Sequence, residues 1–234
     1  MYLVISRHGK NILKKSPHTL GFTLVELMVV IGLIGLLTML AVPAFQSSNR
    51  GARLRTAVFQ FNTTVSLARQ TAITTRQRVL VVVPDDDPVL FGGNYNEYVR
   101  KAFRAYAIYG REDGYLSEWR ELPQGVVFDP DENPQGRRNF FLSGGATPIF
   151  LEDEIPFPNE DAPMREIFAL GFWPDGTMGG SSPAMFYFAE GWTEYNPDTG
   201  SFDDIFLVED LPIKGLSVNA LTGQTNIREF ERSN

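Results

Sequence analysis

The sequence contains no cysteine, and its only two histidines, His8 and His18, lie close to the N-terminus. The absence of cysteine excludes disulfides, thiolate metal ligands and cysteine nucleophiles. Beyond His18 there is also no histidine, so histidine-based triads and His/Cys metal sites are excluded there. The chain contains no P-loop, dinucleotide-binding fingerprint or EF-hand loop. We therefore expect a protein that is not an enzyme, with no catalytic residues, no metal site and no cofactor.

Charge is distributed unevenly along the chain, whose formal net charge is −7. Residues 1–21 carry four basic residues and no acid, whereas residues 79–234 carry 27 of the 28 acidic residues. An acidic domain repels nucleic acid, so we do not expect a nucleic-acid partner. Two interpretations are open for the acidic runs, Ca²⁺ ligands or solvated loops; the runs lie at 85–87, 129–133, 152–154 and 196–204. We expect solvated loops, because none has the spacing of a Ca²⁺-binding loop.

One long apolar run contrasts with this polar chain. All 16 residues of Leu27–Val42 except Thr38 are apolar or glycine, and the run extends to Phe22 and Phe45. At about 1.5 Å per helical residue, 24 residues reach across a hydrocarbon core of roughly 30 Å. The preceding basic residues predict a cytoplasmic N-terminus. The alternative is a cleaved secretory signal, but its apolar core is normally shorter and precedes a small-residue site.

The carboxylate of Glu26 lies near the start of this apolar run and needs compensation, because an isolated charge in hydrocarbon costs several kcal/mol. The stretch GFTLVELMVVIGLIGLLTMLAVPAF (residues 21–45) resembles the N-terminal signature of type IV prepilins and type II secretion pseudopilins. The resemblance implies that a prepilin peptidase/N-methyltransferase cuts between Gly21 and Phe22 and methylates the new N-terminus at Phe22. It also implies that Pro43 is the helix-kinking proline of the family.

The resemblance suggests how the charge of Glu26 is compensated. Cleavage creates an amine on Phe22, one helical turn from Glu26. In the family the glutamate pairs with the amine of a neighbouring subunit, and such pairing offsets much of the burial cost and sets axial register. The alternative is that Glu26 extends to water at an interface. Glu26 and Pro43 are therefore the expected assembly residues.

An amphipathic helix is expected after Pro43. The apolar residues follow helical spacing and share one face; they are Leu54, Val58, Phe61, Val65, Ala68 and Ala72. The stretch LARQTAITTRQRVLVVV (67–83) resembles the H-type minor pseudopilin and FimT-like branch, the GspH/FimT family, in which this helix leads directly into a first strand. The arginines of residues 43–78 are expected to meet the acidic domain or a neighbouring subunit, with phosphate binding as the alternative.

The remainder of the chain predicts short strands separated by turns. Strands are expected at 78–84 and 103–110, and a closing hairpin at 214–230 has its turn near Thr222-Gly223. The stretches at 119–130 and 167–191 resemble further segments of the family, and Pro174-Asp175-Gly176 is expected to form a tight turn. Residues 91–96 and 131–163 match nothing in the family pattern and are expected to be loop insertions.

The expected fold is therefore α+β and pilin-like, with a long N-terminal helix packed on an antiparallel β-sheet domain. The expected parts are a leader (1–21), a transmembrane and fibre-core helix (22–45), an amphipathic helix (46–78) and an acidic β-rich periplasmic domain (79–234). The resemblance implies a minor pseudopilin in the bacterial inner membrane, single-pass, that joins the pseudopilus of a type II secretion system. Its partners would be other pseudopilins or pilins, the inner membrane, and a secretion or pilus platform. The alternative is a minor type IV pilin (FimT-like) in pilus assembly or DNA uptake.

Overall fold

The structure is a computed structural model that describes residues 22–86, 99–130, 139–141, 151–178, 183–196, 198–199, 202–208 and 211–230. Residues 40–50 and 151–153 are described by their backbone alone. The chain divides into two compact units, Met1–Gln46 and Ser47–Asn234. The expected cleavage site at Gly21 lies outside the described residues, and the side chain of Pro43 is not described.

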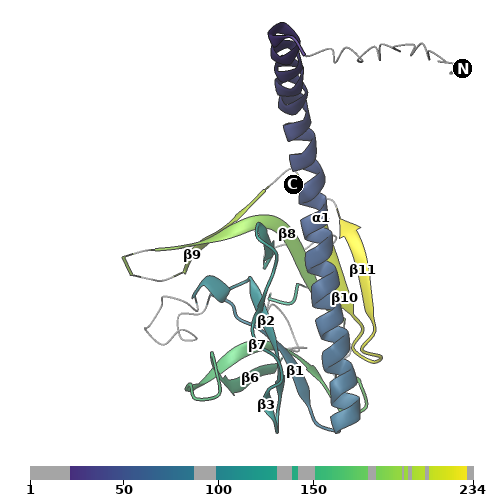
Figure 1. Cartoon of the computed structure of the whole chain (residues 1–234). Coiled ribbons are helices and arrows are strands. Elements are labelled where there is room, and N and C mark those ends of the chain that lie inside the picture. Colours follow the sequence, from purple (N-terminus) through teal and green to yellow (C-terminus); the bar gives the residue numbers. More distant parts are fainter. Residues whose placement is uncertain are drawn as a thin grey trace, which may run out of the picture. The chain divides into compact units, whose positions relative to one another are not determined.

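The second unit is dominated by short antiparallel strands (Figure 1). The elements in chain order are α1 (Leu24–Thr75), β1 (Val79–Val83), the 3-10 turn η1 (Val99–Lys101), β2 (Ala105–Gly110), β3 (Gly114–Tyr115), β4 (Arg120–Glu121), β5 (Val126–Phe128), β6 (Leu151–Pro156), β7 (Met164–Phe172), β8 (Ala184–Tyr195), β9 (Phe202–Leu207), β10 (Ile213–Val218) and β11 (Thr225–Phe230).

The strands form two sheets. The six-stranded sheet has the order β3-β2-β1-β7-β6, with β4 paired to β2. The five-stranded sheet has the order β11-β10-β8-β5, with β9 paired to β8. Strand β1 lies between β2 and β7, where Val81 is opposite Ile108 on one side and Leu170 on the other. All five residues of β1 are buried, as a continuous Val/Leu run in a central strand requires. The strands predicted at 78–84 and 103–110 and the hairpin predicted at 214–230 are confirmed.

The core of the second unit combines one face of α1 with both sheets. The helix residues predicted to share a face are all buried; they are Leu54, Val58, Phe61, Val65, Ala68 and Ala72. Phe61 is fully buried and packs edge-on against Tyr106 of β2, Phe128 of β5 and Phe186 of β8, with ring centroids 4.7–5.1 Å apart. One helical side chain thus touches strands of both sheets.

The structure corrects the expected fold class. We expected an α+β, pilin-like fold in which a long helix packs on an antiparallel β-sheet, but the chain is mainly β, with two antiparallel sheets of six and five strands. Residues 54–72 of α1 share a single apolar core with both sheets. The sequence expectation failed because periodicity identifies a buried face without specifying how many sheets cover it.

The structure also corrects the transmembrane assignment of residues 22–45 and the expected single-pass location in the inner membrane. A crossing helix needs about 20 consecutive, mostly apolar residues. Within the residues that the structure describes, no helix meets the length and hydrophobicity that such a crossing requires.

Two strands occur where the sequence predicted loops. Strand β6 (LEDEIP) lies within the expected insertion 131–163, and β9 (FDDIFL) overlaps an acidic run that was expected to be a solvated loop. Both contain acidic residues, which have low intrinsic preference for strands. Each is held instead by pairing with a longer partner, β6 with β7 and β9 with β8.

Candidate assembly surfaces

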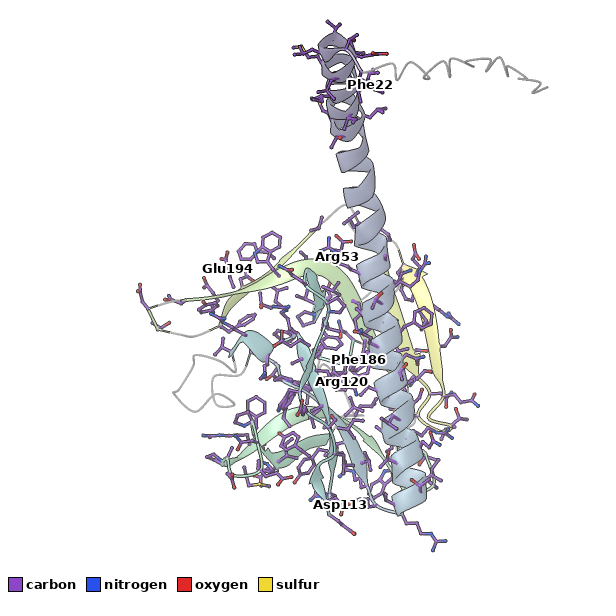
Figure 2. The ribbon with its side chains drawn as sticks, viewed as in Figure 1. Phe22, Arg53, Asp113, Arg120, Phe186 and Glu194 are labelled. Carbon is purple, nitrogen blue, oxygen red and sulfur yellow. The ribbon has the colours of Figure 1, made fainter. Side chains whose placement is uncertain are left out.

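The first candidate surface is the N-terminal part of α1. Every side chain from Phe22 to Met39 is exposed. Thirteen of them are large hydrophobic residues, with exposed fractions between 40% for Val30 and 81% for Met39. They lie on every side of the helix, and Figure 2 labels Phe22 among them. A helix that is apolar around its whole circumference is typically covered by other apolar groups on several sides.

Glu26 begins this surface and forms a capping box with Thr23. The Thr23 amide and hydroxyl both donate to Oε2 of Glu26 at 3.2 Å, and the Glu26 amide donates to the Thr23 hydroxyl at 3.2 Å. This reciprocal arrangement satisfies amides at the helix start, where a carboxylate also interacts favourably with the helix dipole. The T-x-x-E spacing at 23–26 would have revealed this role from the sequence. The structure therefore shows a local partner for Glu26, and Phe22 beside it is exposed.

The arginines of α1 and the segment after it form a second group of candidates. Arg53 donates from Nη1 to the carbonyl of Gln124 at 3.3 Å, and the Arg78 guanidinium lies over the Trp173 ring at 5.1 Å. The hydrogen bond from Lys214 is the main cause of the lowered pKa of Glu229, and the charge of the exposed Arg55 adds a smaller lowering. Two arginines of this basic segment, Arg53 and Arg78, therefore contact residues of the acidic domain of the same chain.

Arg69 connects the helix to two predicted turns. Its Nε donates to the carbonyl of Gly176 at 3.1 Å, in the tight turn that begins with Pro174. Gly223 lies against the same arginine and the same carbonyl, and both glycines have positive φ, +80° at Gly176 and +63° at Gly223. Both predicted turns are therefore confirmed.

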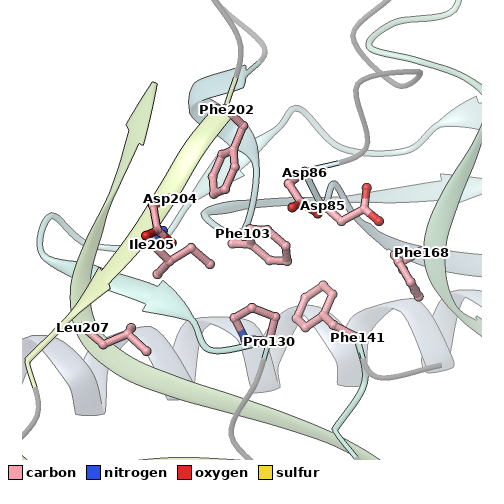
Figure 3. Close-up of a pocket in the computed structure, with 10 residues that line it drawn as sticks. All are labelled: Asp85, Asp86, Phe103, Pro130, Phe141, Phe168, Phe202, Asp204, Ile205 and Leu207. Atoms are coloured by element: carbon pink, nitrogen blue, oxygen red, sulfur yellow. The ribbon is translucent and has the colours of Figure 1, made fainter. Parts of the chain in front are cut away.

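A pocket of about 270 Å³ is lined by residues of β9, by Phe168 of β7 and by the segments that follow β1 and β5 and precede β2 (Figure 3). Its apolar lining consists of Phe103, Pro130, Phe141, Phe168, Phe202, Ile205 and Leu207. Three carboxylates, Asp85, Asp86 and Asp204, also line it, so two acidic runs of the sequence meet here. Among the described residues, no group of three acidic or histidine side chains has the arrangement of a metal site. The lining suits an apolar group that carries a positive charge.

Comparison with known proteins gives no match: no protein-family model, no curated protein and no solved structure matches this chain. The resemblance of residues 21–45 to prepilins therefore stays a sequence-based expectation.

Proposed function

We propose that this chain is a structural subunit of a type II secretion pseudopilus, a minor pseudopilin that assembles through the N-terminal part of α1. The observation that carries the proposal is the exposed apolar surface of Phe22–Met39, which surrounds the helix. A helix that joins one partner needs only one apolar stripe. An apolar surface on every side suits a helix enclosed by several others, as in the centre of a helical filament.

The free energy available from covering this surface is large. Complete burial of a large apolar side chain contributes about 1.5–3 kcal/mol. Thirteen such side chains, roughly half to four-fifths exposed in most cases, give an upper bound on the order of 10–20 kcal/mol. That amount is comparable with the cost of immobilising one subunit among its neighbours, which is about 4–15 kcal/mol. Enclosure by neighbouring helices therefore offsets most of the cost of holding the subunit in a filament.

Glu26 has a specific place in this proposal. Its carboxylate is exposed at the first turn and is oriented by two hydrogen bonds from Thr23. A carboxylate oxygen accepts more than one hydrogen bond, so Glu26 retains capacity for an amine on a neighbouring subunit. A prepilin peptidase/N-methyltransferase would supply that amine by cleaving before Phe22. The further partners would be other pseudopilins and the secretion platform.

Filament composition tests the proposal. The full chain is expressed with an epitope tag in its native host, filaments are sheared from the cells, and the sheared fraction is analysed by immunoblot. The wild-type chain should be present, and Glu26→Ala should be processed normally but depleted about tenfold or more, because a charged hydrogen bond is lost. The control is Leu221→Ala, which removes an apolar side chain that is 71% exposed in the turn between β10 and β11 and should leave incorporation unchanged.

Two results would contradict the proposal. A processed wild-type chain that is absent from sheared filaments would exclude the structural role, and equal incorporation of Glu26→Ala would exclude the role of the carboxylate. Recovery in retractable pili instead of secretion filaments would replace the assignment with a minor type IV pilin. Tight, salt-sensitive binding of duplex DNA in a gel shift would favour DNA uptake over secretion.

A further inference from the structure

The β8–β9 hairpin carries an exposed aromatic pair on one face. Trp192 of β8 is directly opposite Phe206 of β9, and the two rings stack with centroids 5.6 Å apart and an interplanar angle of 11°. Trp192 is 51% exposed and Phe206 is 38% exposed. A stacked pair that stays this open to water loses much of the benefit of burial, so it marks a contact surface.

Two carboxylates adjoin this aromatic pair. Glu194 is directly opposite Asp204, two residues along each strand from Trp192 and Phe206, so strand alternation directs the Cβ atoms of all four to one face. Asp204 also lines the pocket, and its Oδ1 accepts a hydrogen bond from the Ile205 amide at 2.7 Å. We call Trp192, Glu194, Asp204 and Phe206 the hairpin face; Figure 2 labels Glu194 on it. Like charges directly opposite each other in a sheet are destabilising. Residues 184–207 contain no lysine or arginine, and within the described part of the chain neither carboxylate has an ion pair.

The hairpin face is held in place from behind. Ile205 and Leu207, which alternate with Phe206, line the pocket, so the strand is anchored by apolar contacts on that side. At the end of β8 the Arg100 guanidinium lies over the Tyr195 ring at 5.0 Å and donates to its hydroxyl at 2.7 Å. The aromatic pair and the two carboxylates therefore form a preorganised surface, which lowers the cost of binding.

The chemistry of the hairpin face selects a cationic and apolar partner. A flat indole ring stacks favourably with a guanidinium, and a carboxylate pair relieves its mutual repulsion by binding the same cation. Phe206 adds apolar area beside that cation. An arginine next to an aromatic or aliphatic side chain satisfies all of these requirements.

The same chain presents such a surface on α1. Residues 50–78 contain six arginines and no acidic residue. On the side of the helix away from the core, Phe59 is 55% exposed and Leu67 is 46% exposed, and the exposed Arg55 lies one turn before Phe59. We call Arg55, Phe59, Thr63 and Leu67 the helix face; their spacing of four residues aligns them along one ridge.

We propose that the helix face of one copy docks on the hairpin face of a second copy, with Arg55 between Trp192 and the two carboxylates. The two faces differ, so the contact between the two copies is head-to-tail. The proposal rests on the proposed function only for its setting in a filament. It uses neither Glu26 nor the apolar residues before Met39, so each proposal can fail alone.

Crosslinking between copies tests the contact, because the chain has no natural cysteine. Full-length Arg55→Cys and Glu194→Cys proteins with different tags are mixed in mild detergent and treated with a short bis-maleimide. Crosslinked pairs that carry both tags should form at least about tenfold more than with Thr74→Cys in place of Arg55→Cys. Thr74 is exposed on the same helix but roughly 28 Å farther along its axis. Equal yields from Arg55→Cys and Thr74→Cys would overturn the proposal.

Charge reversal supplies a second readout that does not depend on the crosslinker. Glu194→Arg and Arg55→Glu should each weaken self-association by about tenfold or more, and the double variant should recover most of that loss. Trp192→Ala should weaken it as well, whereas Trp173→Ala, which removes another exposed tryptophan, should not. The proposal is wrong if the single reversals leave self-association unchanged or if the double variant is no better than either. Repeating the crosslink with Glu26→Ala separates this contact from the N-terminal one, since its yield should not change.

Discussion

Replacing Phe61 by alanine should strongly destabilise the second unit. Phe61 is fully buried on α1 and contacts four aromatic rings, with centroid distances of 4.7 Å to Phe186, 5.1 Å to Tyr106 and to Phe128, and 5.6 Å to Phe188. These rings belong to strands of both sheets, so the substitution opens a cavity where the helix and both sheets meet.

The magnitude follows from the contacts that are lost. A buried Phe→Ala substitution costs about 3–5 kcal/mol, and the loss of four edge-on ring contacts favours the upper part of that range. We expect about 4–5 kcal/mol, a large share of the roughly 5–15 kcal/mol that stabilises a typical domain. For a domain of this size the melting temperature falls by about 2–4 °C per kcal/mol. The expected decrease is therefore about 8–20 °C.

Phe59→Ala is the matched control, since Phe59 is two residues away on the same helix but 55% exposed. It should change the free energy of unfolding by no more than about 0.5 kcal/mol. Both variants of the full chain are unfolded in urea and followed by tryptophan fluorescence and near-ultraviolet circular dichroism, with the denaturant slopes compared. If Phe61→Ala and Phe59→Ala differ by less than about 1 kcal/mol, the second half of α1 does not belong to this core, and the reasoning fails.

Three further outcomes are expected. Mass spectrometry of the protein from its native host should give Phe22 as the first residue, with one added methyl group; an unprocessed or differently cut chain would refute this. Gly223→Ala should reduce stability by about 2–4 kcal/mol in thermal unfolding, because φ is positive there and a Cβ would also clash with the facing turn. Gly125→Ala should cost less, because φ is positive there too (+81°) but a Cβ would meet only the Arg53 guanidinium, at 3.5 Å. Lys214→Met should raise the pKa of Glu229, which is lowered chiefly by the hydrogen bond from Lys214, and an NMR titration should detect the rise. Because the pKa of Glu229 is lower in the folded than in the unfolded protein, its carboxylate stabilises the fold at pH values above its unfolded-state pKa. This stabilisation is lost as the pH falls through the folded-state pKa. Lys214→Met lacks most of this contribution, so its free energy of unfolding should decrease less on acidification than that of the wild type.

Elements with strong periodicity were predictable from the sequence. The apolar face of residues 54–72 and the buried run of β1 follow helical spacing and a continuous Val/Leu pattern, and both are buried as expected. The turns at Gly176 and Gly223 were predictable as well, because positive φ favours glycine strongly. These sequence patterns depend only on residues close together in the chain, so they predict an element without knowledge of what it packs against.

Features that depend on tertiary pairing were not predictable. Strands β6 and β9 contain acidic residues that suggest loops, and only pairing with β7 and β8 makes them strands. The pocket and the hairpin face arise from β9, so neither was accessible from the sequence. The number of sheets could not be predicted for the same reason, because pairing between strands far apart in the sequence decides which strands belong to one sheet.

Three separate sequence motifs converge on Arg69. Its Nε donates to the carbonyl of Gly176, which lies 107 residues farther along the chain, and a Cβ on Gly223 would collide with both that carbonyl and the arginine. The LAR, PDG and TG motifs are thus parts of one contact that joins α1 to two turns. Their joint presence is explained by the packing of a helix against two sheets, so it carries information about stability and none about a partner. The proposed contacts with other subunits are therefore made by residues that the fold does not need, namely the exposed apolar side chains up to Met39 and the hairpin face around Trp192.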